Sequence, residues 1–230
     1  MSRFSLLTNQ PDLHLATGST LPGLTTHLHG DGLIVGRDQR SAPVTLRLFR
    51  PEPTLIVLVG GTGLAQLLSM RAMALGAQVH IETTRPGAWE PFLRGCGAGP
   101  DIVVMTLPGH QPAYAPSLTR PRLVLVDSGA TVGQDLTVTM PRRTVIVFRE
   151  ELTAWDIDTV GAADAVVMQR LTEAEAAVAA ATLQVTTSQG WFSRIGPEMV
   201  AVAGQGRVRW AMVSPTSIER RLFPSLARSG

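Results

Sequence analysis

Short apolar runs recur along the chain from residue 33 to residue 213, each bounded by glycine, proline or small polar residues. Continuous runs of Val, Leu and Ile are typical of strands that are buried on both faces of a sheet. We therefore predict such strands in LIVLV (55–59), QVHIET (78–83), DIVVMTL (101–107), RLVLVD (122–127), RTVIVFRE (143–150) and DAVVMQRL (164–171).

Helical patterns lie between several of these strands. A helix is expected over Leu64–Leu75, stopped by Gly76, and a short one around Trp89–Arg94. Two further helices carry a capping box, in which a threonine and an acidic residue three positions later bond to each other's backbone. These pairs are Thr153 with Asp156, and Thr172 with Glu175.

Two hairpins flank this alternating region. LIVGRD and PVTLRLF read as strands joined by the turn-like DQRSA, and EMVAVAGQGRVRWAMVS reads as a hairpin turning at Gly204–Gly206. Strands that alternate with helices indicate a three-layer α/β fold with a mostly parallel sheet, of the P-loop or Rossmann kind. We divide the chain into an irregular segment with a hairpin (1–50), a nucleotide-binding-like domain (51–185), and a C-terminal hairpin with a basic tail (186–230).

The amino-acid composition limits which reactions and which partners the protein can have. All 20 basic residues are arginine, so every mechanism that requires a lysine is excluded. The net charge is only +2 and no cationic stripe is visible, so we expect no nucleic-acid partner. The single cysteine, Cys96, excludes an internal disulfide, and no apolar run approaches the ~20 residues of a membrane span. We expect a cytoplasmic protein that meets a membrane only through its partners.

The turn after the strand at 55–59 is the first candidate site, with glycines at Gly60, Gly61 and Gly63. A P-loop adds a lysine and a serine or threonine to such glycines, and both are missing here. A Rossmann turn needs a third glycine, where this chain has Gln66, and an acid about 20 residues later, which Glu82 supplies. The remaining alternative is a tight turn that binds nothing.

Two weaker candidates complete the survey. Asp127 ends an apolar strand, as does the carboxylate that holds magnesium in a Walker B strand, and an inert turn has the same pattern. His27, His29 and Asp31 form an H-x-H-x-D triplet whose donors suit zinc. The triplet resembles the metallo-β-lactamase motif but has Gly32 where that motif has another histidine, so incidental histidines in a turn are the favoured interpretation.

Longer segments carry two resemblances. The stretch GLIVGRDQRSAPVTLRLFRPEPTLIVLVGGTGLAQLLSMRAMALGA resembles the start of FtsK/SpoIIIE-type ATPase domains, with a shortened phosphate loop. The segments LFRPEPTLIVLVGG, RAMALGAQVHIETTRPGAWEPF and EELTAWDIDTVGAADAVVMQRLTEAEAA are similar to the soluble part of actinobacterial EccE-like proteins of type VII (ESX) secretion. That resemblance implies an accessory protein that docks on a membrane secretion complex, although the hydrophobic N-terminal spans of the family are missing here.

These observations lead to two functional hypotheses. The first is a non-catalytic scaffold with a pseudo-ATPase-like domain, without a cofactor, that contacts other components of a secretion complex. The alternative is a Rossmann-class enzyme or sensor that binds a dinucleotide or adenosyl cofactor at Gly60, Gly61, Gly63 and Glu82, with Asp127 as a further candidate ligand.

Overall fold

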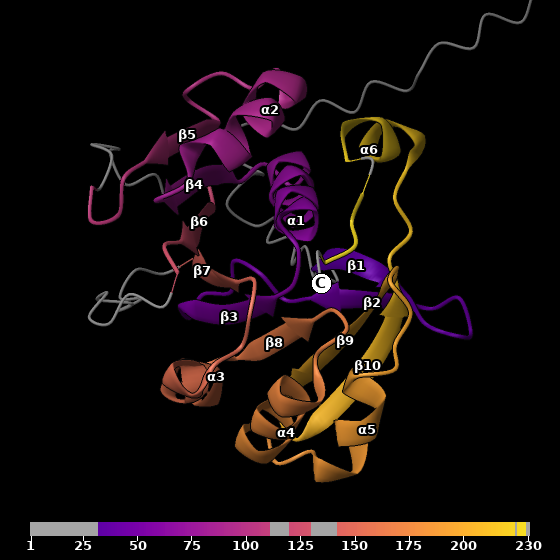
Figure 1. The fold of residues 1–230 in the computed structure, drawn as a ribbon. Coiled ribbons are helices and arrows are strands. Elements are labelled where there is room, and N and C mark those ends of the chain that lie inside the picture. The colour runs from indigo at the N-terminus through magenta and orange to yellow at the C-terminus, as the bar shows by residue number, and fades with distance from the viewer. Residues whose placement is uncertain (1–31, 111–119, 130–141, 224, 229–230) are drawn as a thin grey trace, which may run out of the picture. The chain divides into compact units, whose positions relative to one another are not determined.

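One sheet of ten strands runs through the protein, in the order β2-β1-β10-β9-β8-β3-β7-β6-β4-β5. The computed structural model describes residues 32–110, 120–129, 142–223 and 225–228 (Figure 1). The strands are β1 (Leu33–Arg37), β2 (Pro43–Leu46), β3 (Thr54–Val59), β4 (Gln78–Thr83), β5 (Val103–Thr106), β6 (Arg122–Asp127), β7 (Arg143–Arg149), β8 (Ala165–Met168), β9 (Met199–Gly204) and β10 (Arg207–Met212).

The strands from β8 to β5 in this order pair in parallel, as the apolar runs predict. β3 lies between β7 and β8, and its pairing with β7 runs without a shift from Thr54↔Thr144 to Val59↔Arg149. The chain leaves β3 towards β4, beyond β7 and β6, and later returns to β8 on the other side. The turn after β3 therefore lies at a topological switch point, where open α/β sheets bind their ligands.

The two predicted hairpins form, and they join the same sheet. β1 pairs with β2 and with β10, and β9 pairs with β10 and with β8, all antiparallel. Strands from all three segments of the predicted division therefore belong to one sheet, and the division at residues 50 and 185 stays a prediction. Asp31–Gly230 forms one compact unit.

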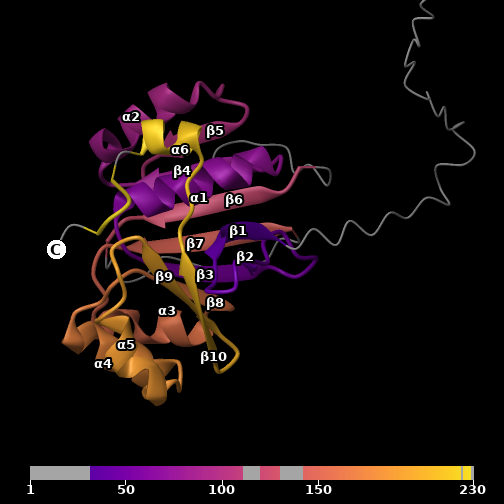
Figure 2. The same cartoon turned by 90° about the vertical axis from the view of Figure 1, so that its right-hand side faces the viewer.

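Helices cover both faces of the sheet, which confirms the predicted three-layer α/β fold. α1 and α2 lie on one face, and α3, α4 and α5 lie on the other (Figures 1 and 2). The helices are α1 (Thr62–Ala74), α2 (Pro86–Cys96), α3 (Ile157–Ala162), α4 (Glu173–Thr182), α5 (Gln189–Phe192) and α6 (Ser217–Leu222), with 3-10 turns at η2 (Ala154–Asp156) and η3 (Thr186–Ser188). Within the described ranges no helix combines the length and apolarity of a membrane span.

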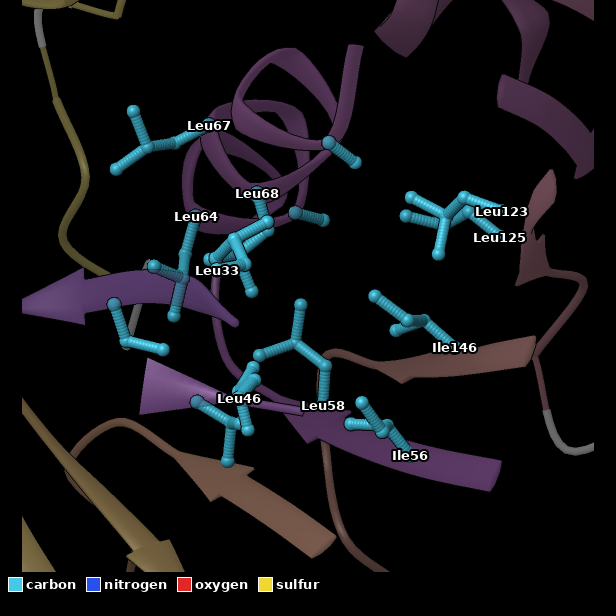
Figure 3. Packing of buried hydrophobic residues seen from close by; sticks show 14 of the residues in the cluster. Leu33, Leu46, Ile56, Leu58, Leu64, Leu67, Leu68, Leu123, Leu125 and Ile146 are labelled. Atoms are coloured by element: carbon cyan, nitrogen blue, oxygen red, sulfur yellow. The ribbon is translucent and has the colours of Figure 1, made fainter. Parts of the chain in front are cut away.

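Alternation along the strands divides the core into two clusters. Ile56 and Leu58 of β3 face α1 and meet its Leu64 and Leu68 (Figure 3). Val57 and Val59 of the same strand point to the opposite face, which α3, α4 and α5 cover. β3 is thus buried on both sides, and it holds the turn that follows it in a fixed position.

The helix ends confirm several sequence signals. Both predicted capping boxes are present, at the start of η2 (Thr153 and Asp156) and of α4 (Thr172 and Glu175). Gly76 follows α1 with φ +84°, a conformation that glycine adopts at little cost. α6 was not predicted and lies within the segment described from sequence as a basic tail.

Candidate functional site

Only Gly60 and Gly61 separate the end of β3 from the start of α1. Gly60 N–H donates to the carbonyl oxygen of Arg149 (2.9 Å), and Gly61 N–H donates to Gln169 Oε1 (2.7 Å). A phosphate cradle needs successive N–H groups turned towards one point, which an alternation of right- and left-handed residues provides. None of Gly60, Gly61 and Gly63 has a positive φ. The turn therefore lacks both the length and the conformation of a phosphate loop.

These glycines are needed for space rather than for backbone conformation. A Cβ at Gly60 would lie 2.6 Å from Gln169 Oε1, and one at Gly61 would lie 2.9 Å from the carbonyl oxygen of Ala227. A Cβ at Gly63 would overlap the carbonyl oxygen of Ser225. The surface that a nucleotide would approach is thus covered by residues of the same chain.

Gln169 connects the turn to the C-terminal segment. It follows β8 directly and is 2 % exposed. Its Oε1 accepts the Gly61 N–H bond, and its Nε2 donates to the carbonyl oxygen of Leu226 (2.6 Å). One neutral side chain therefore satisfies a donor of the glycine turn and an acceptor of residues 225–228, which we name the tail segment.

An ion pair fixes the end of the tail segment. Arg228 contacts both carboxylate oxygens of Glu175, at 2.5 and 3.0 Å, and donates to the carbonyl oxygen of Arg170 (3.1 Å). Burial by itself would raise the pKa of Glu175, but the Arg228 guanidinium and the backbone N–H groups of Leu152 and Thr172 lower it to about 2. Arg228 of the tail segment thus contributes, with these N–H groups, to keeping the buried Glu175 carboxylate charged.

Asp127, the candidate magnesium ligand, is buried and bonded to the protein. Its Oδ2 accepts from Trp89 Nε1 (2.7 Å) and Thr83 Oγ1 (3.0 Å), and its Oδ1 accepts from Arg85 (2.8 Å). Such a set of donors satisfies both carboxylate oxygens and makes Asp127 a hub that ties α2 to the sheet. The residues here do not fit a magnesium–nucleotide complex.

Arg85 occupies the space between the strand ends. It bridges Asp127 and Glu150 (2.8 Å to each), and its guanidinium carbon lies 5.9 Å from the centre of the Phe148 ring. Glu150 also accepts a bond from Thr62 Oγ1, at the first residue of α1 (3.2 Å). The threonine hydroxyl next to the glycine turn is thereby directed to a carboxylate.

Glu82 does not reach the glycine turn, because β6 and β7 separate its strand from β3. Three strand spacings correspond to about 14 Å. A Rossmann acid lies on the strand next to the glycine turn, so the dinucleotide arrangement is not formed. Glu82 Oε1 instead lies 3.7 Å from Nδ1 of His80. Burial, followed by the positive charges of Arg122 and Arg143, lowers the pKa of His80 to about 4.

The zinc candidates His27, His29 and Asp31 lie outside the described residues. Within the parts of the chain that the structure describes, no three His, Cys, Asp or Glu side chains gather as metal ligands.

Comparison with known proteins shows which solved structures have a similar fold. No family model and no curated protein sequence matches the chain. A solved structure that is similar is the genome packaging NTPase B204 from Sulfolobus turreted icosahedral virus 2 in complex with AMPPCP, at TM-score 0.50 and 9% identity over 73% of this chain and 100% of that one. Its complexes with ATP-gammaS and AMP match at TM-score 0.47, with 8% and 10% identity over 70% of this chain and 97% of theirs.

At this identity the similarity shows the fold alone. The protein has a P-loop NTPase-like α/β fold, which confirms the P-loop-type half of the resemblance noted in the sequence. The resemblance to EccE-like secretion proteins stays a prediction.

Sequence reasoning missed Gln169, Arg85 and the tail segment. Arg85 comes shortly after a predicted strand, at the carboxyl edge where functional side chains gather, and that position is a usable signal. Gln169 lies inside the predicted strand 164–171, whereas the observed β8 ends one residue before it. The tail segment has no comparable signal, because its role depends on where the chain returns in space.

Because the tail segment covers Gly63, the effect of Gly63→Ala on the free energy of unfolding should change sign when the tail segment is removed. Gly63 is the second residue of α1, where alanine is intrinsically favoured over glycine. We expect Gly63→Ala to lower the free energy of unfolding of the full chain by about 1–3 kcal/mol, because its Cβ meets a backbone carbonyl. In a chain ending at Phe223 the same change should instead stabilise by up to about 1 kcal/mol. Urea unfolding of the four proteins measures both values.

Gly161→Ala in α3 is the matched control. Its Cβ would meet only Thr182, at 3.8 Å, so it should stabilise by a similar small amount with or without the tail. Equal effects of Gly63→Ala in both backgrounds would show that the tail segment does not cover the turn.

The ion pair of Glu175 predicts a pH dependence. A carboxylate whose pKa is lowered on folding stabilises the fold fully above its ordinary pKa of 4.5 and loses this contribution as pH falls towards 2. The difference in free energy of unfolding between the wild type and Glu175→Gln should therefore be largest near pH 6–7 and shrink below about pH 4.5. Exposed Glu173→Gln, on the same turn of α4, is the control and should stay close to the wild type. A difference that does not change with pH would contradict the assignment.

Proposed function

We propose that the protein is a non-hydrolysing P-loop NTPase-like domain that acts by binding other proteins. The observation that carries this proposal is the packing of Gln169 and the tail segment against the glycine turn. The glycine turn lies at the switch point where open α/β sheets bind their ligands. Atoms of Gln169 and of the tail segment occupy this edge of the sheet.

Three requirements of phosphoryl transfer are unmet at this edge. The chain has no lysine to neutralise a phosphate. The turn is two residues long, and its N–H groups bond to Arg149 and Gln169. Asp127 is buried and accepts bonds from Trp89, Thr83 and Arg85, so a metal ion would have to displace these donors. The remote position of Glu82 likewise leaves the dinucleotide alternative without its ribose ligand.

Protein binding is supported by exposed aromatic residues. Trp155 in η2 is 78 % exposed and Trp191 in α5 is 64 % exposed. Tryptophan is enriched among the residues that dominate protein interfaces, and burying such a ring on a partner contributes strongly to affinity. The helices on the α3–α5 face are therefore the surface on which we expect a partner to dock.

The nucleotide part of the proposal is tested by thermal unfolding of the full chain with ATP–Mg, ADP, NAD(H), NADP(H) and S-adenosylmethionine. A ligand at 100 times its dissociation constant stabilises by about 2.7 kcal/mol, which is several degrees for a chain of this size. We expect no shift with any of them. A shift that Gly63→Val abolishes would overturn the proposal.

We also propose that the partners are components of a type VII secretion complex. The support is the resemblance of the three quoted segments to EccE-like proteins. Co-purification with the membrane components of such a complex is the test, and Trp191→Ala should weaken it about tenfold or more, as loss of an interface anchor does. Met212→Ala, at an exposed apolar residue of β10, is the control. Absence of co-purification would remove the secretion assignment and leave the fold-based proposal intact.

A further inference from the structure

The tail segment occupies its place as a bound peptide would. The carbonyl oxygens of Ser225 and Ala227 face Gly63 and Gly61, and the Leu226 side chain packs against the main core cluster. The Leu226 carbonyl accepts from Gln169, and the Arg228 side chain reaches Glu175. Main-chain contacts thus alternate with side-chain contacts, as in the recognition of extended peptides.

The arginine position is the most selective part of this site. The Glu175 side chain is 8 % exposed and the Arg228 side chain 12 % exposed, so the pair is shielded from solvent. The neighbouring Arg170 carbonyl accepts a further guanidinium N–H. A planar guanidinium satisfies these three acceptors together, whereas a lysine ammonium presents a point charge with a different geometry.

The charge of the site favours a cationic peptide over a nucleotide. Without Arg228, Glu175 would keep the bonds from the backbone N–H groups of Leu152 and Thr172 and from the Thr172 hydroxyl, but it would lose its guanidinium partner. Glu150, which borders the glycine turn through its bond to Thr62, is already paired with Arg85. The vacated arginine position would thus present the buried carboxylate of Glu175, which attracts a guanidinium and repels a phosphate.

The tail segment can leave without disturbing the helix before it. α6 is held separately, by the bidentate pair of Arg71 with Glu219 (2.7 and 3.0 Å). Phe223, which is 4 % exposed, packs against Phe92 at a ring-centroid distance of 6.0 Å. Among the described residues, release after residue 223 therefore breaks the contacts of residues 225–228.

We propose that the surface between the glycine turn and α4, on which the tail segment lies, is a binding site for an extended, arginine-bearing segment of a partner protein. The chain's own tail segment occupies this site until the partner displaces it. Glu175 and the Arg170 carbonyl select the arginine, while Gln169 and the glycine turn hold the main chain. The inference rests on the proposed protein-binding function and adds the chemistry of the partner.

A labelled peptide with the sequence of residues 223–230 (FPSLARSG) tests the site. The host is the full chain carrying Arg228→Ala, whose own tail segment has lost its anchor. An intramolecular competitor acts at millimolar effective concentration, so the peptide should bind this host about tenfold or more tighter than the wild type. The control host, Arg221→Ala, removes an exposed arginine of α6 and should behave as the wild type does. Fluorescence anisotropy gives the dissociation constants.

Changes in the peptide keep the test independent of host folding. The Arg228→Ala peptide should lose binding to the Arg228→Ala host, and the Arg228→Lys peptide should bind several-fold more weakly than the arginine form. Adding Glu175→Gln to that host should also abolish the preference for arginine.

The outcomes separate this inference from the proposed function. Equal binding of the arginine and alanine peptides, or no peptide binding together with no nucleotide binding, overturns the peptide site and leaves the non-hydrolysing domain in place. A thermal shift of the Arg228→Ala host with ATP–Mg overturns both, because the vacated edge would then be a nucleotide site.

Discussion

The buried amide of Gln169 is the interaction on which the arrangement of the ligand edge depends. This neutral group meets both a donor of the glycine turn and an acceptor of the tail segment. Because the amide is almost fully buried, loss of either bond would leave a polar group without a partner, at a cost of about 1–3 kcal/mol. The turn, the end of β8 and the tail segment are therefore stabilised together.

The glycines after β3 have a different role here from the phosphate binding that their sequence pattern suggests. Glycines after a central strand are usually explained by a phosphate that approaches the backbone. In this protein a side-chain amide and two carbonyl oxygens approach it instead. Arginine takes over the remaining charge: Arg85, Arg149 and Arg228 each pair with carboxylates at the strand ends or next to them. The edge is thereby neutralised from within.

The local features were predictable from sequence and the long-range ones were not. QVHIET and RLVLVD match β4 and β6, and both capping boxes form, because each depends on neighbours a few residues away. Glu82 has the correct spacing from Gly61 but lies on a strand inserted beyond β6 and β7, and spacing along the chain carries no information on strand order. Asp127 was correctly placed at a strand end, whereas its bond from Trp89 depends on the packing of α2 against the sheet.

The pairing of β1 with β10 has a consequence for how the chain folds during synthesis. Arg37 lies opposite Met212, so β1 completes its pairing only after the chain as far as β10 has emerged from the ribosome. Contacts of such sequence separation slow folding, because the entropy of closing a long loop is lost before the contact forms. Until then β1 presents an unpaired edge, which is a hazard for aggregation. We therefore expect the nascent chain to depend on chaperones more than its modest size suggests.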